Sequence, residues 1–197
     1  MQSWFFVVAA YLMGSVSFAV LMSRAFNLPD PRSYGSGNPG ATNVLRTGKK
    51  AAAALTLLGD AAKGWLAVWL TLRYLPQDVQ TIALVSIAVF LGHLYPIFFR
   101  FQGGKGVATA LGILLALNPW IGLACFVTWL VVAKLFKVSS LSALVAAVVA
   151  PVYVWLLGEP IEYIGVAVIL ALLLVWRHKS NIQNLLSGKE GKIGGKA

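Results

Sequence analysis

The sequence predicts an all-α integral membrane protein with seven transmembrane helices, its N-terminus outside and its C-terminus in the cytoplasm. Three observations predict this class. Hydrophobic residues make up 59% of the 197 residues and the mean hydropathy is +0.80, which exceeds what a soluble core needs. The apolar residues form runs of about 20 residues, long enough to cross a bilayer. Lys and Arg collect between alternate runs, as the positive-inside rule requires.

The composition also limits the classes of partner and cofactor. Sixteen Lys and Arg against six Asp and Glu give a formal charge of +10, which fits an anionic membrane surface and anionic substrates better than nucleic acid in so apolar a chain. Cys125 is the single cysteine and lies in an apolar run, so we expect no disulfide, no metal site and no cofactor. We expect one domain, 1–197, with a basic tail from about 177 to 197.

The first three spans are Trp4–Met22, Ala51–Leu72 and Val79–Phe99. The first run has no basic segment before it and no small-residue cleavage pattern, so we expect a retained anchor. The second span contains Asp60 and Lys63, which lie on one helical face at a spacing of three residues. Mutual neutralisation explains this pair, although an ionisable pair at such depth is also a functional candidate.

The run Val107–Ala133 fits either one long helix or two helices that break at Asn118-Pro119. Basic residues lie on both sides of the run, at Arg100 and Lys134 among others, and the positive-inside rule places both groups in the cytoplasm. An even number of crossings must separate them. The sequence therefore predicts two helices, of which the first is short and tilted or only partly membrane-deep.

Leu141–Leu157 and Ile161–Trp176 complete the seven spans. With this topology 14 of the 16 Lys and Arg residues fall in cytoplasmic segments; Lys63 lies within a helix and Arg73 on the other face. Three polar segments then share the cytoplasmic face: the loop 35–46, the loop 103–106 and the tail that begins at Arg177 and His178. We expect these segments to converge.

The loop GSGNPGATNVLR has the composition of an anion site. Its Gly and Pro residues allow backbone N–H groups to turn toward one point, and Arg46 adds a cation that suits phosphate oxygens. The neutral donors are Ser36, Asn38, Thr42 and Asn43. The alternative interpretation is a surface loop that caps a helix.

A second candidate anion site is the segment Gly103-Gly104-Lys105-Gly106, with backbone amides and one ammonium. It is not a Walker A loop, because Gly106 supplies no hydroxyl for magnesium. The chain also lacks a His-x4-Asp acyltransferase dyad, since Phe98 and Gln183 stand five residues after His93 and His178. We expect His93 to be a buried hydrogen-bonding residue, and His178 with Asn181 to contact substrate.

Three motifs, GSGNPGATNVLRTG, GHLYPIFFRFQGGKGVATALG and RHKSNI, together resemble the acyl-phosphate-dependent glycerol-3-phosphate acyltransferases of bacterial cytoplasmic membranes, the PlsY family. The resemblance covers nearly the whole chain. It implies transfer of an acyl chain from acyl phosphate to the 1-hydroxyl of glycerol 3-phosphate in the inner membrane, with the site facing the cytoplasm and a soluble enzyme supplying acyl phosphate. It also implies a site lined by Ser36, Asn38, Thr42, Asn43, Arg46, Lys105, His178 and Asn181. Asn184 departs from the family, which commonly has Arg there.

The residues themselves are compatible with this chemistry. We expect Lys105 and the amides of Gly103, Gly104 and Gly106 to bind one phosphate and Arg46 to bind the other. Ser36 and Asn38 would polarise the carbonyl or orient the hydroxyl. Ser36 as a covalent nucleophile is the alternative, but no base can be assigned to it; a donor phosphate oxygen can take the proton instead.

Two other functions compete with acyl transfer. A membrane anion transporter for phosphate would explain the short span beside glycine-rich segments, and a non-catalytic scaffold would explain the apolar helices alone. The polar motifs lie at one membrane face, whereas a carrier binds its substrate near the midplane. This placement favours the enzyme.

Overall fold

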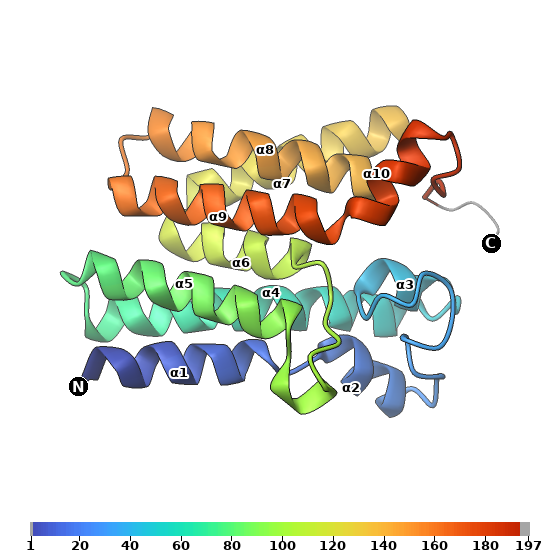
Figure 1. Cartoon of the computed structure of the whole chain (residues 1–197), viewed down its shortest axis with the longest axis horizontal. Coiled ribbons are helices and arrows are strands. Elements are labelled where there is room, and N and C mark those ends of the chain that lie inside the picture. The colour runs from blue at the N-terminus through green and yellow to red at the C-terminus, as the bar shows by residue number, and fades with distance from the viewer. Residues whose placement is uncertain (1, 194–197) are drawn as a thin grey trace.

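The computed structural model describes residues 2–193, which form a bundle of helices (Figure 1). The helices are α1 (Gln2–Gly14), α2 (Phe18–Ala25), α3 (Ala41–Leu45), α4 (Lys50–Tyr74), α5 (Val79–Leu94), a 3-10 turn (Ile97–Phe99), α6 (Val107–Leu117), α7 (Pro119–Phe136), α8 (Ser139–Leu156), α9 (Ile161–Arg177) and α10 (Lys179–Leu186). The long helices run side by side, and α2, α3, α10 and the α5–α6 connection gather at one end.

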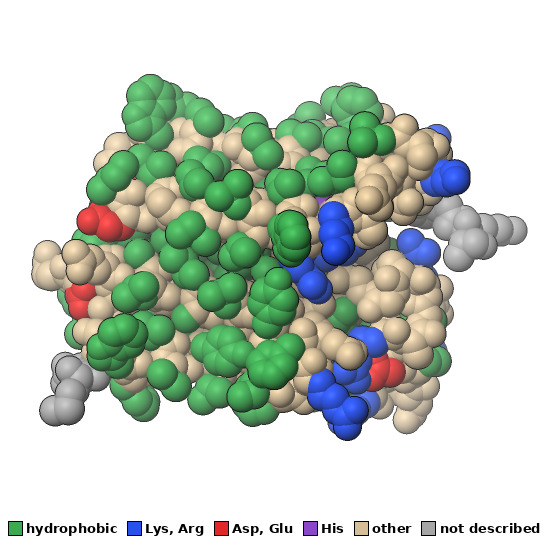
Figure 2. Space-filling model, viewed as in Figure 1, with side chains coloured by type: hydrophobic (Ala, Val, Ile, Leu, Met, Phe, Trp, Pro, Cys, Tyr) green, Lys and Arg blue, Asp and Glu red, His purple; other side chains and the backbone are tan. Residues whose placement is uncertain are grey.

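The bundle has the apolar helices of an integral membrane protein. Within residues 2–193, four helices are long and apolar enough to cross a bilayer, or up to six if α1 with α2 and α9 with α10 each count as one bent span. The helix α6 is also apolar but shorter than a full span. Hydrophobic side chains cover the sides of the bundle, whereas Lys and Arg gather toward the end that holds α2, α3 and α10 (Figure 2).

The prediction of one continuous helix over Trp4–Met22 was wrong. The chain forms α1 and α2 instead, and their axes differ by 42°. A Cβ added at Gly14 would lie 2.1 Å from the Val89 carbonyl oxygen, so α1 packs closely on α5 just where α1 ends. Ser17 then caps α2, because its hydroxyl accepts a hydrogen bond from the Val20 N–H at 3.5 Å.

The predicted break at Asn118-Pro119 is confirmed. The Asn118 side chain accepts a hydrogen bond from the Trp120 N–H at 2.8 Å and so caps α7. Pro119 occupies the first position of α7, where the missing N–H costs nothing. The amide of Asn118 also donates to Glu159 at 2.6 Å, which fixes the turn between α8 and α9 beside this break.

Close packing of α4 on α6 holds the α5–α6 connection at the end of the bundle. A Cβ at Gly112 would lie 1.9 Å from the Ala61 carbonyl oxygen, and one at Gly64 would lie 2.4 Å from that of Thr109. Without side chains, these glycines let the two backbones approach closely. The segment that precedes α6 is therefore placed firmly against α4 and α5.

Candidate active site

Asn43 shapes the loop 35–46. Its buried carboxamide accepts a hydrogen bond from the Ser36 N–H at 3.0 Å and donates to the carbonyls of Pro31 and Tyr34 at 2.7 and 3.2 Å. All three bonds lie within this part of the chain. Asn43 therefore acts here as the internal support of the loop, and it holds the exposed Ser36 side chain at the surface.

Three backbone amides of this loop bond within the loop and do not face an anion. The Gly37 N–H donates to the Tyr34 carbonyl and the Gly40 N–H to that of Asn38, each at 2.9 Å, while the Ser36 N–H is taken by Asn43. These donors satisfy the tight turn itself, because a turn this compact must pair its own backbone groups. These three amides are therefore not available to an anion.

The loop begins at a well-defined ion pair. Arg32 donates to Asp30 through Nε at 2.9 Å and Nη2 at 2.6 Å, and these hydrogen bonds lower the pKa of the Asp30 carboxyl below its usual range. This two-pronged contact between Arg32 and Asp30 also fixes the turn that leads into Gly35. Gly35 has a φ of +58°, which suits glycine.

The glycine segment 103–106 packs against this loop and is held from two sides. On one side the Gly104 N–H donates to the His93 carbonyl at 3.2 Å. On the other side Arg177 donates to the carbonyls of Gly103 and Gly104 at 2.8 and 3.2 Å. A Cβ at Gly104 would lie 3.1 Å from the Pro39 carbonyl oxygen, so the two predicted anion segments are in contact.

Lys105 projects from this segment toward α10. Its ammonium donates a hydrogen bond to the Asn181 side-chain oxygen. The Asn181 amide in turn donates to the Glu190 carboxylate at 2.5 Å, and the Ser140 hydroxyl donates to the same oxygen at 2.7 Å. The chain Lys105–Asn181–Glu190–Ser140 thus joins the glycine segment, α10, the tail and α8.

Lys105 lies in a cluster of cations. Burial lowers the pKa of Lys105, repulsion from Arg177 and Arg46 lowers it further, and the Glu190 carboxylate partly opposes both effects. A bound anion would favour the charged ammonium in the same way that Glu190 does. Three cations therefore meet where the sequence analysis expected an anion site.

The remaining predicted residues surround this cluster. Arg46 ends α3, and its guanidinium lies 3.7 Å from where a Cβ of Gly191 would be. His178 is buried, and its Nδ1 lies 2.8 Å from the Leu174 carbonyl oxygen. Since a carbonyl only accepts, we assign the proton to Nδ1, which leaves Nε2 for a ligand. Thr42 is exposed on α3.

Gly103 and Gly106 also have structural reasons to be glycine. A Cβ at Gly106 would lie 2.3 Å from the Phe90 ring, and Gly106 has a φ of +88°. A Cβ at Gly103 would lie 2.1 Å from the His93 carbonyl oxygen. Both positions exclude a side chain, which keeps the backbone close to α5.

The family model described as glycerol-3-phosphate acyltransferase matches residues 4–188. The chain belongs to the glycerol-3-phosphate acyltransferase family. Relatives with that name include proteins of Methylobacillus flagellatus, 59% identical over 197 residues that cover all of both chains, and Burkholderia pseudomallei, 62% identical over 198 residues that cover 100% of this chain and 98% of the relative.

Two solved crystal structures of PlsY, an integral membrane glycerol 3-phosphate acyltransferase, have the same fold as this acyltransferase. The glycerol 3-phosphate form superposes with a TM-score of 0.94 at 35% identity, covering 98% of this chain and 96% of that one. The lysophosphatidic acid form gives 0.92 at 34% identity, covering 100% and 97%. The predicted family and the integral membrane architecture are confirmed.

Sequence reasoning missed two residues that organise the acyltransferase site. Arg177 holds the glycine segment through two carbonyls, and its place at the start of RHKSNI was the available signal. Glu190 lies in the Gly-rich basic tail, and no local pattern marked it. Both act through backbone or long-range contacts, which spacing along the chain does not reveal.

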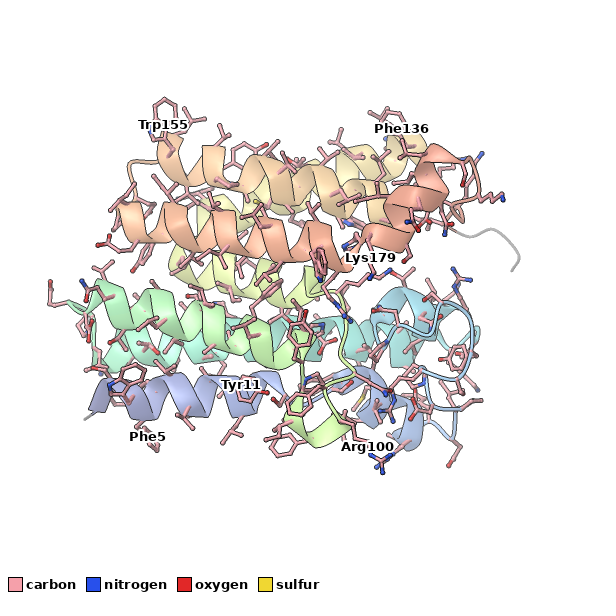
Figure 3. The ribbon with its side chains drawn as sticks, viewed as in Figure 1. Phe5, Tyr11, Arg100, Phe136, Trp155 and Lys179 are labelled. Atoms are coloured by element: carbon pink, nitrogen blue, oxygen red, sulfur yellow. The ribbon has the colours of Figure 1, made fainter. Side chains whose placement is uncertain are left out.

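Replacing Arg177 with Lys should lower kcat/KM roughly 100-fold, because one ammonium cannot reproduce the two-pronged contact with Gly103 and Gly104 and Lys105 would shift. The control is Lys179→Met. Lys179 lies just beyond α9 (Figure 3), and its ammonium lies 5.5 Å from the centre of the Trp176 ring, whereas the glycine carbonyls are bonded by Arg177. Steady-state kinetics of both variants checks this; equal activity of Arg177→Lys and wild type would contradict the assignment.

Proposed function

We propose that this acyltransferase takes its acyl group from acyl phosphate and transfers it to the 1-hydroxyl of glycerol 3-phosphate, releasing lysophosphatidic acid and inorganic phosphate. The observation that carries the proposal is the placement of three cations at one end of an apolar bundle. Arg177 bonds the Gly103 and Gly104 carbonyls next to Lys105. Arg46 lies beside Gly191, which follows the Glu190 that Asn181 joins to Lys105. Both substrates bear a phosphate group and one carries an acyl tail. A cationic site at the edge of the membrane suits both, because the tail can stay in lipid.

In the proposed reaction the glycerol hydroxyl oxygen attacks the acyl carbonyl carbon. The bond between that carbon and the phosphate oxygen breaks, and the hydroxyl proton passes to an oxygen of the departing phosphate, which leaves as inorganic phosphate. Acyl phosphate is already activated. Orientation and stabilisation of negative charge by fixed donors therefore suffice, without a covalent enzyme intermediate.

We assign the residues to this reaction by their position. Lys105, supported by Asn181, binds one phosphate, and Arg46 binds the other. Ser36 and Asn38 polarise the carbonyl or orient the hydroxyl. The substrate contacts proposed around them are Thr42, Asn43, Gly103, Gly104, Gly106, His178 and Asn181. Asn43 and the glycines contribute through the shape of the backbone, since Asn43 bonds within its own loop and the glycine segment is held by His93 and Arg177.

The position of the site argues against the transporter alternative. The cationic residues gather at one end of the bundle (Figure 2), whereas a carrier holds its substrate between helices near the membrane midplane. The charges buried deeper in the described chain, Asp60 and Lys63, neutralise one another at 2.9 Å. Among residues 2–193 we therefore assign no second cationic site along the helices to anion transport.

We also propose that the acyltransferase crosses the bacterial inner membrane seven times, with the N-terminus outside and the site in the cytoplasm. The 14 of 16 Lys and Arg residues in the proposed cytoplasmic segments support this orientation. Acyl phosphate would then come from a soluble cytoplasmic enzyme. The site needs no metal in this proposal, because Lys and Arg carry the positive charge.

Purified protein in detergent should convert acyl phosphate and glycerol 3-phosphate to lysophosphatidic acid in the presence of EDTA. Lys105→Ala and Arg46→Ala should each lower this activity about 100-fold or more, since each removes a charged contact from a phosphate. Product analysis by mass spectrometry, with acyl coenzyme A as the alternative donor, provides the measurement.

The donor and the site are tested separately by this experiment. Product from acyl coenzyme A but none from acyl phosphate would overturn the proposed donor. Equal rates for wild type, Lys105→Ala and Arg46→Ala would instead overturn the site assignment. Ser36→Ala that still forms a covalent acyl-enzyme would show that acyl transfer follows another route.

The orientation predicts opposite labelling of two cysteines placed at exposed positions in a Cys125→Ala background. In intact spheroplasts, a membrane-impermeant maleimide should label Gln77→Cys in the turn before α5 and should not label Ser187→Cys beyond α10. Both cysteines should react once the membrane is permeabilised. The reverse pattern would place the site outside.

A further inference from the structure

A buried cluster of charged and polar side chains lies behind the glycine segment, outside the residues assigned above. The Lys63 ammonium is 2.9 Å from Asp60 Oδ1, and His93 Nδ1 is 3.6 Å from the same oxygen. The three residues are only 3%, 3% and 7% exposed. Asp60 thus pairs with the cation on its own helix and faces the imidazole on α5, whose Nδ1 makes no hydrogen bond to it at this distance.

His93 contacts the glycine segment with both its backbone and its ring. Its carbonyl accepts the Gly104 N–H at 3.2 Å and lies 2.1 Å from where a Cβ of Gly103 would be. Its Nε2 lies 2.3 Å from where a Cβ of Gly104 would be. The ring therefore fills the space beside Gly104, directly before Lys105.

The other end of the cluster reaches the break in the first span. The Lys63 ammonium donates a hydrogen bond to the Val16 carbonyl at 2.8 Å, between α1 and α2. A carbonyl released at a helix break needs such a donor, since it is buried away from water. The cluster thus links the α1–α2 break, α4, α5 and the glycine segment in one set of contacts.

Stability alone is a weak reason for burying such charges. A buried ion pair repays its desolvation only in part, and apolar replacements of similar volume are often as stable. A fixed geometry is a better reason, because a buried ring enclosed between Asp60 and Gly104 has little room to move.

We propose that His93 is a positioning residue for acyl transfer: its ring, which is enclosed between the Asp60–Lys63 pair and Gly104, fixes Gly104 and thereby the place of Lys105. This inference rests on the proposed function in one respect, namely that Lys105 binds a substrate phosphate. His93 touches no substrate in this proposal. Its effect passes through the backbone of the glycine segment.

Two substitutions distinguish the side of the His93 ring near Asp60 from the side near Gly104. His93→Asn keeps a polar group near Asp60 but removes the atoms beside Gly104, whereas His93→Gln retains a nitrogen that can reach Gly104. His93→Asn should raise the KM for a phosphate-bearing substrate about tenfold or more, and His93→Gln should restore most of that loss. The matched control is Ser86→Ala, a buried polar residue of α5 that bonds only the Ile82 carbonyl at 2.8 Å among the described residues.

Hydrogen–deuterium exchange gives a readout that does not depend on the reaction. His93→Asn should speed exchange in the peptide that covers 100–107, with the rest of α5 unchanged, and Ser86→Ala should not. If Asn at 93 prevents folding, the double variant Asp60→Asn with Lys63→Met removes the charges in a balanced way and should raise the same KM and exchange rate.

The outcomes distinguish this inference from the proposed function. Unchanged KM values and unchanged exchange at 100–107 in a folded variant would overturn the positioning role. A fall in kcat alone that follows the amount of folded protein would do the same, because it shows only structural support. Failure of wild type and Ser86→Ala to use acyl phosphate would overturn the donor, while the exchange data would still decide the role of His93.

Discussion

The proximity of Lys105, Arg177 and Arg46 is the constraint on which the rest of this end of the molecule depends. Like charges repel more strongly as they leave water, so a partly buried cluster must be held by other contacts. Arg177 is held by two carbonyls, and Lys105 is held by Asn181, whose amide also binds Glu190. The result is a site whose positive charge is only partly neutralised in the free protein. In our proposal an anionic substrate neutralises the rest.

The helices serve this cluster by bringing distant segments to one end of the bundle. Gly14 and the glycines at the α4–α6 contact let neighbouring backbones approach so closely that a Cβ would not fit between them. Helix breaks at 15–17 and at 178 then turn the chain across the end of the bundle, where polar backbone can meet water. The apolar sides remain available to lipid and to an acyl tail.

Much of this arrangement could be predicted from the sequence, because span length, charge placement and the Asn118-Pro119 break are local signals. The Asp60–Lys63 pair was equally readable from its spacing. The break after Gly14 was not, since it follows from packing against Val89. The same holds for Arg177 and Glu190, and for the loop amides that pair within the turn instead of facing a ligand. Contacts between distant segments have no counterpart in local pattern.

A crystal structure with glycerol 3-phosphate bound tests the central claim most directly, because it locates the phosphate relative to the cations. The account predicts phosphate oxygens within hydrogen-bond distance of Lys105 or Arg46, with the glycine segment still held by Arg177 and His93. A phosphate bound elsewhere, or a glycine segment released from both residues in the complex, would contradict it.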